Sequence, residues 1–139
     1  MILRNLALLT RTNPQEFLDW MRREFIDARE WVMMPNVIGM GVHADGGQMM
    51  TKPYAAGGAY ISRKSNYCKP CRYDPKQRTG VLACPFTTLY WDFLDRKREG
   101  LGKNHRMAQQ FVGLDRLTDL PEVWEQAKEV LEGLEVGTI

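Results

Sequence analysis

Apolar residues recur at helical spacing along most of this 139-residue chain, and this repeat constrains the fold more than any other feature. The clearest example lies between residues 14 and 34, where the apolar positions fit one helix face: Phe17, Trp20, Met21, Phe25 and Ala28. Asn13 is the expected N-cap of this helix, because Pro14 takes the first helical position and Glu16 follows three residues after the cap. Pro35 is expected to end it.

Three later segments, 85–99, 104–117 and 119–134, also have helical patterns, and Asp119 is the expected cap of the last one. Residues 36–60 are rich in glycine and apolar, which is typical of a buried loop around another group. Strand signals are weak throughout. The sequence therefore predicts one all-α domain over residues 1–139, with five or six helices and one long ordered loop that carries the cysteines.

The composition gives no indication of a disordered, membrane-spanning or strongly basic nucleic-acid-binding protein. Hydrophobic residues make up 44% of the chain and charged residues 26%, a globular balance, and the net charge of +2 is too small to indicate nucleic-acid binding by itself. No segment has the roughly 18 apolar residues of a membrane span. We also expect no signal peptide, and therefore a cytoplasmic protein that makes no membrane contact.

All three cysteines lie in one segment, as Cys68-x-x-Cys71 followed, after twelve intervening residues, by Cys84, which stands directly before Pro85. In a reducing compartment, this spacing favours a metal or redox use over a disulfide. Three readings remain open from the residues: free thiols, a zinc site completed by His43 or His105, and an iron–sulfur cluster whose fourth ligand lies outside this chain.

Three motifs carry a resemblance to a known family: "PNVIGM", "ADGG" followed by "TKPYA", and Cys-x-x-Cys-x12-Cys-Pro-Phe followed by "LYWDFL". From about residue 3 to about residue 117, the chain resembles the C-terminal part of the iron–sulfur bacterial cryptochromes and photolyases, also called deoxyribodipyrimidine photolyase-related proteins. The resemblance implies the all-helical, FAD-binding part of a cryptochrome/photolyase fold. It also implies that the chain matches about the last third of a full-length member.

The resemblance implies the following site residues, by their positions here. Trp20 matches an electron-transfer tryptophan, and Met40 and Tyr54 match positions in the lesion pocket. The implied FAD-binding residues are Asp27, Asn36, Gly39, Asp45, Gly46 and Gly47. The implied ligands of a 4Fe-4S cluster are Cys68, Cys71 and Cys84, with the fourth cysteine upstream of this chain.

The parent activity implied by the family is light-driven repair of (6-4) pyrimidine photoproducts in damaged DNA. The chain departs from the family pattern at Met21, Arg29 and Met33, so we do not expect it to be a complete enzyme by itself. A chain that carries the upstream photolyase segment is an expected partner. The alternative is a non-enzymatic helical module that binds a metal or cluster and contacts nucleic acid or completes a partner chain, for which the charges of Arg22, Arg23 and Arg29 are the supporting feature.

The cysteine segment also carries a structural expectation. Residues 67–84 are rich in charge and poor in apolar surface, with seven basic residues around the loop: Lys52, Arg63, Lys64, Lys69, Arg72, Lys76 and Arg78. Such density suits a surface that faces phosphate groups. Because the segment has little apolar surface to hold it, we expect a bound cluster to pin it in place.

Overall fold

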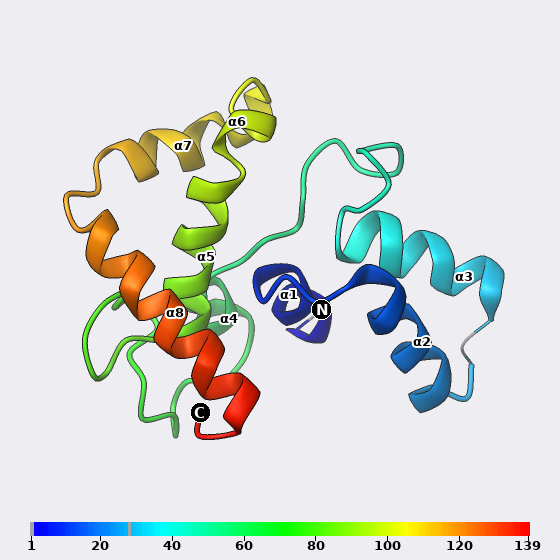
Figure 1. The fold of residues 1–139 in the computed structure, drawn as a ribbon, viewed down its shortest axis with the longest axis horizontal. Helices are drawn as coiled ribbons and strands as arrows, with labels where there is room; N and C mark the ends of the chain where they lie inside the picture. The colour runs from blue at the N-terminus through cyan, green and yellow to red at the C-terminus, as the bar shows by residue number, and fades with distance from the viewer. Residues whose placement is uncertain (1, 28) are drawn as a thin grey trace. The chain divides into compact units, whose positions relative to one another are not determined.

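The computed structural model describes residues 2–27 and 29–139, and Ala28, which the sequence pattern assigned to a helix face, lies outside this range. In the described residues the secondary structure is helical, without β-strands; an isolated bridge joins Asp74 to Ala83. The predicted all-α class is confirmed. The chain divides into two compact units, one reaching Ala55 and one from Ala56 to Ile139, and we describe each by itself (Figure 1).

Unit 1 contains α1 (Ile2–Leu9), α2 (Pro14–Glu24), α3 (Glu30–Met34) and the π-helix η1 (Pro35–Gly41). The predicted N-cap of α2 is confirmed, because Asn13 Oδ1 accepts hydrogen bonds from the backbone N–H groups of Gln15 (2.9 Å) and Glu16 (3.3 Å). These two bonds satisfy N–H groups that have no partner inside the helix.

The helix expected over residues 14–34 is interrupted. α2 ends at Glu24, Phe25 has extended backbone, and α3 begins at Glu30. Arg22 spans the break, since its guanidinium donates to Asp19 on α2 and to Glu30 at the start of α3. One arginine thereby links the two helices across a turn that the apolar pattern does not reveal.

Pro35 ends the α-helical hydrogen bonding, as predicted, because α3 ends at Met34. The helical path nevertheless continues, since Pro35 begins the π-helix η1, which reaches Gly41 (Figure 1). Proline lacks an N–H donor and its ring crowds the preceding turn of an α-helix, so the α-helical hydrogen-bond ladder is interrupted at Pro35 and the wider, rarer π-turn follows it here. The segment 36–60, expected as an irregular loop, therefore starts with ordered helix.

The core of unit 1 joins its four helical elements and the residue after η1. It consists of Ala7, Phe17, Leu18, Met33, Val37 and Val42, with Met21 and Ile38 packed against it. Trp20 and Phe25 are different: they fit the same apolar pattern, yet 37% and 40% of their surfaces remain exposed. Only part of the predicted apolar face of α2 is therefore used inside this unit.

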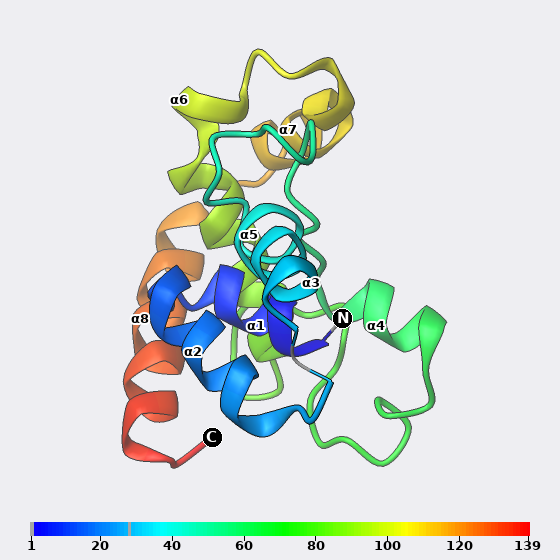
Figure 2. The ribbon, with the colours of Figure 1, turned by 90° about the vertical axis from the view of Figure 1, so that its right-hand side faces the viewer.

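Unit 2 contains α4 (Gly58–Lys64), α5 (Pro85–Arg96), α6 (Arg98–Leu101), the 3-10 turn η2 (His105–Met107), α7 (Ala108–Asp115) and α8 (Leu120–Val136). The segments predicted at 85–99, 104–117 and 119–134 are thus helical, although the first two are divided into shorter pieces. Helix α5 is central and packs against α4, α7 and α8 (Figure 2). Leu89, Leu94 and Leu114 are completely buried in this packing.

Residues 73–84 are held in place by protein groups. Thr87 Oγ1 donates to the carbonyl of Pro75 (2.8 Å), and Thr88 Oγ1 donates to the carbonyl of Arg78 (2.7 Å). Arg78 Nε donates to both carboxylate oxygens of Asp119 (3.0 and 2.7 Å), and the N–H of Gly80 donates to Gln126 Oε1 (3.1 Å). Helices α5 and α8 therefore anchor the second half of this loop, a contribution that the sequence did not predict, and the pinning of the loop by a bound cluster stays a prediction.

Asp119 is the N-cap residue of α8, as predicted, but its side chain makes no capping hydrogen bond to that helix. Its carboxylate is turned to Arg78 instead. An ion-pair partner 41 residues away in the sequence cannot be foreseen from the local capping pattern.

Candidate functional site

The glycine-rich part of unit 1 brings together most of the residues predicted to bind FAD. Asn36 and Gly39 lie on η1, and Asp45, Gly46 and Gly47 form a tight turn in the following segment, residues 42–50, which we call the glycine loop. The loop lies directly on η1: a Cβ built on Gly39 would come within 2.9 Å of Asp45 Oδ2 and 2.7 Å of Met49 Cγ. Glycine at 39 is therefore required for the loop to approach the helix.

Asp45 holds the loop in shape. Its Oδ1 accepts a hydrogen bond from the N–H of Gly47 (3.0 Å), and its Oδ2 accepts one from the N–H of Met49 (2.8 Å). The N–H of Met49, followed by that of Gly47, lowers the pKa of Asp45 below its ordinary value of 3.8, because both bonds favour the charged carboxylate. Asp45 therefore stabilises the turn.

The turn itself needs glycine for its backbone. Gly46 and Gly47 have φ values of 70° and 86°, in the left-handed region that side chains with a Cβ rarely adopt. A Cβ built on Gly46 would meet nothing within 4 Å, so that side of the turn is open in the described structure.

His43, predicted from the sequence only as a possible zinc ligand, also lies in this loop. It has a φ of 53°, and its buried Nδ1 makes no hydrogen bond with the described residues. A buried ring nitrogen without a partner carries an energetic cost, and such groups are often satisfied by a ligand or water. A positive φ at a histidine leaves no signal in the sequence, which explains why its role in the loop was missed.

The other two residues predicted to bind FAD, Asn36 and Asp27, make their hydrogen bonds outside the glycine loop. Asn36 uses its side-chain Nδ2 to donate to the carbonyl of Val32 (2.8 Å), while its own carbonyl accepts from Arg4 (3.3 Å). Asp27 lies in the turn between α2 and α3 and is exposed. Among residues 2–27 and 29–139, no hydrogen bond joins the Asp27 side chain to the glycine loop.

The residues predicted for electron transfer and lesion contact are partly exposed. Trp20 stacks on Phe17 with a ring separation of 6.1 Å and meets Phe25 edge to face at 6.4 Å. Met40 is half-buried on η1, and Tyr54 follows the glycine loop with 53% of its surface exposed. These positions leave Trp20 and Tyr54 accessible to a partner or ligand.

The three cysteines differ in their surroundings. Cys71 is exposed, Cys68 is half-buried, and Cys84 is buried at the start of α5. A Cβ built on Gly58 would lie 2.6 Å from Cys84 Sγ, so this sulfur packs against α4. Within residues 2–27 and 29–139, no group of three or more His, Cys, Asp or Glu side chains is arranged to hold a metal ion. The expected convergence of the three thiols is therefore not seen.

No helix in the described part of the chain has both the length and the hydropathy that a membrane span requires. No protein-family model matches the chain. A (6-4) photolyase of Agrobacterium fabrum is 54% identical over 119 residues, which cover 86% of this chain and 24% of that protein. An uncharacterized protein, R855, of Acanthamoeba polyphaga mimivirus is 31% identical over 106 residues, which cover 74% of this chain and 79% of that protein.

The two relatives differ in length relative to this chain. The chain spans about a quarter of the photolyase but most of the viral protein. The identity to the photolyase extends through both compact units, since it covers 86% of the chain. Together with the all-helical fold, this similarity shows that the chain belongs to the photolyase/cryptochrome family.

Proposed function

We propose that this chain is a portion of a photolyase-type flavoprotein of the iron–sulfur subtype, whose parent activity is light-driven repair of (6-4) pyrimidine photoproducts in DNA. The observation that carries the proposal is the 54% identity to a (6-4) photolyase over 86% of the chain. Because the chain spans 24% of that relative, we propose that a chain or segment corresponding to the remainder completes the active protein in the cytoplasm.

The glycine loop is the proposed FAD contact in this chain, and its chemistry fits the cofactor. Gly46 and Gly47 allow close approach of a ligand to the backbone, and His43 has an unpaired buried Nδ1 in the same loop. Asp45 keeps the loop in one conformation through its two N–H contacts. When bound, FAD supplies the light-driven electron chemistry, and the protein groups orient the cofactor and exclude water around it.

Trp20 and Tyr54 have proposed roles beside the flavin. Trp20 is the proposed electron donor, and its contacts with Phe17 and Phe25 fix its ring on the surface of α2. Tyr54 is the proposed contact to an extruded base, because its exposed ring can stack and its hydroxyl can hydrogen-bond. Met40 on η1 is the proposed apolar neighbour of the lesion.

We propose that Cys68, Cys71 and Cys84 are three ligands of a 4Fe-4S cluster, because thiolates are the usual ligands of such clusters. The fourth ligand would lie in the chain or segment that completes the active protein. The described residues do not fit the cluster as they stand, since Cys84 Sγ packs against Gly58 and the three thiols form no metal-binding group. We therefore assign the cluster no part in the repair reaction.

The test is a repair assay. The chain is co-expressed with the part of the (6-4) photolyase that it does not span, and DNA carrying one (6-4) photoproduct is illuminated with the purified complex. We expect light-dependent repair by the complex, and no repair in the dark or by this chain alone. A flavin-loaded complex that leaves the photoproduct unchanged under illumination would refute the proposed activity.

A second candidate function is a non-enzymatic helical module that binds a metal or cluster and contacts nucleic acid or completes a partner chain. The observation in its favour is the viral relative R855, because this chain spans 79% of that protein. Proteins of nearly this extent therefore occur outside a full-length photolyase. In this case, co-expression would give a stable complex or nucleic-acid binding without any photoproduct repair.

A further inference from the structure

Unit 2 has a strongly uneven distribution of charge. Between Gly58 and Arg78 there are six basic residues and one acidic residue, Asp74. Helix α8 has the opposite balance, with five glutamates and one lysine. Helices α4 and α8 lie on opposite sides of α5 (Figure 2), so the two charge types are separated in space.

Most of the positive charge in this segment is available to a partner. Arg78 is paired with Asp119, while the Asp74 Oδ1 accepts the N–H of Lys76 (2.8 Å) within its own turn. The other five basic side chains are exposed and form no ion pair with any residue that the structure describes: Arg63, Lys64, Lys69, Arg72 and Lys76. We call residues 60–76 the basic segment.

Exposed tyrosines alternate with these cations. Tyr60 and Tyr67 have 37% and 67% of their surfaces exposed. The Lys64 ammonium lies 5.9 Å from the centre of the Tyr60 ring, on the same face of α4. Flat aromatic rings beside cations are the combination that single-stranded nucleic acid requires, because the bases stack on the rings while the cations contact the phosphates.

We propose that the basic segment binds a single-stranded stretch of DNA, with Arg63 and Lys64 at the phosphates and Tyr67 stacked on a base. The inference rests on the proposed function in taking DNA as the ligand, and it adds a contact surface on unit 2 that contains none of the predicted flavin or lesion-pocket residues. An acidic protein would use the same cations but has no bases to stack on Tyr67, so the Tyr67 variants and poly-glutamate in the test below distinguish the two kinds of partner.

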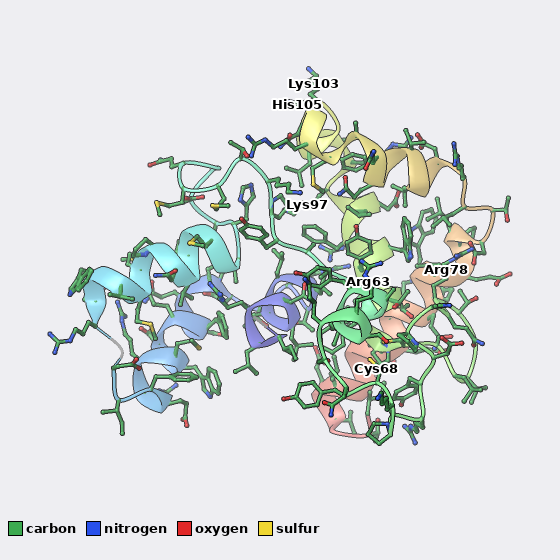
Figure 3. All side chains as sticks on the ribbon, turned by 180° about the vertical axis from the view of Figure 1, so that it is seen from behind. Arg63, Cys68, Arg78, Lys97, Lys103 and His105 are labelled. Carbon is green, nitrogen blue, oxygen red and sulfur yellow. The ribbon has the colours of Figure 1, made fainter. Side chains whose placement is uncertain are left out.

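The test uses the full chain, without flavin and in the dark, with fluorescein-labelled oligo(dT) that carries no lesion. Anisotropy gives the dissociation constant over a series of salt concentrations. In the double variant Arg63→Gln/Lys64→Gln, we expect weaker binding and a log–log salt slope reduced by about 1.4, since each lost contact to a single strand removes about 0.7. The control, Lys103→Gln/Arg116→Gln, removes the same charges elsewhere on unit 2, and Lys103 lies far from Cys68 (Figure 3). Equal weakening in both double variants would overturn the assignment.

Stacking is tested separately. Tyr67→Ala should weaken oligo(dT) binding by roughly tenfold or more, whereas Tyr67→Phe should keep it. A duplex of the same sequence and poly-glutamate should both bind less tightly than oligo(dT). Equal affinity for either competitor, or no effect of Tyr67→Ala, would overturn the inference. Because no lesion, light or flavin is involved, oligo(dT) binding can be confirmed even where the repair assay fails, and it can fail where repair succeeds.

Discussion

Replacing Gly58 by alanine should destabilise unit 2 at the junction of α4, α5 and the loop between them. The added Cβ would lie 2.6 Å from Cys84 Sγ, 2.9 Å from Thr87 Oγ1 and 3.1 Å from the Cα of Pro75, all tighter than ordinary contact. Gly58 is buried, and its N–H donates to Thr87 Oγ1 (3.0 Å), so any shift that relieves the clash also strains this hydrogen bond.

The expected cost follows from these two effects. Overpacking a buried site costs about 1–3 kcal/mol, and a weakened buried hydrogen bond adds about 1 kcal/mol. The better helix propensity of alanine returns at most about 1 kcal/mol at this first position of α4. We therefore expect Gly58→Ala to lower the free energy of unfolding by about 2 kcal/mol.

Gly57 provides a matched control next to it. A Cβ at Gly57 would lie 3.5 Å or more from its neighbours, and its φ of −84° suits any residue. Gly57→Ala should therefore change stability by less than about 0.5 kcal/mol. Urea unfolding measures both variants, and hydrogen exchange of α4 and α5 locates the effect. Equal urea midpoints for wild type and Gly58→Ala would refute the packing of Cys84 against α4.

Two further predictions concern the loops. Because hydrogen bonds lower the pKa of Asp45, its stabilisation of the glycine loop is present above pH 3.8 and is lost as the pH falls through the lower folded value. Amide exchange at Gly47 and Met49 should then accelerate, and Asp45→Asn should abolish this pH dependence; an unchanged profile in the variant would contradict it. In the cysteine segment, Thr88→Val should accelerate exchange across residues 74–84, whereas Cys71→Ser should leave it unchanged. Faster exchange in Cys71→Ser would contradict this prediction, because it would indicate that Cys71 anchors the segment as a metal ligand would.

The sequence predicted the elements whose determinants are local. Asn13 caps α2 through groups two and three residues away, and the segment that becomes α5 carries its pattern within a few turns. The features that were missed depend on distant groups. The Asp119 carboxylate accepts a hydrogen bond from Arg78 instead of capping α8. The break after α2 is spanned by Arg22, which donates to Glu30 at the start of α3.

The candidate site divides in the same way. The glycine turn could be recognised because Gly46 and Gly47 are adjacent in the sequence and both require positive φ. The position of Cys84 could not, because its burial depends on the absence of a side chain at Gly58, 26 positions earlier in the chain. Ligand spacing alone gives no information about which neighbour a thiol faces.

The most direct test of the proposed function is a flavin-binding titration. FAD is added to this chain alone, and to the chain mixed with the part of the (6-4) photolyase that it does not span, and bound flavin is measured by absorption after gel filtration. We expect no stoichiometric flavin on the chain alone and one FAD per complex. Gly39→Ala should remove FAD from the complex, because the added Cβ displaces the glycine loop. Stoichiometric FAD on the chain alone, or a stable complex without flavin, would contradict the account.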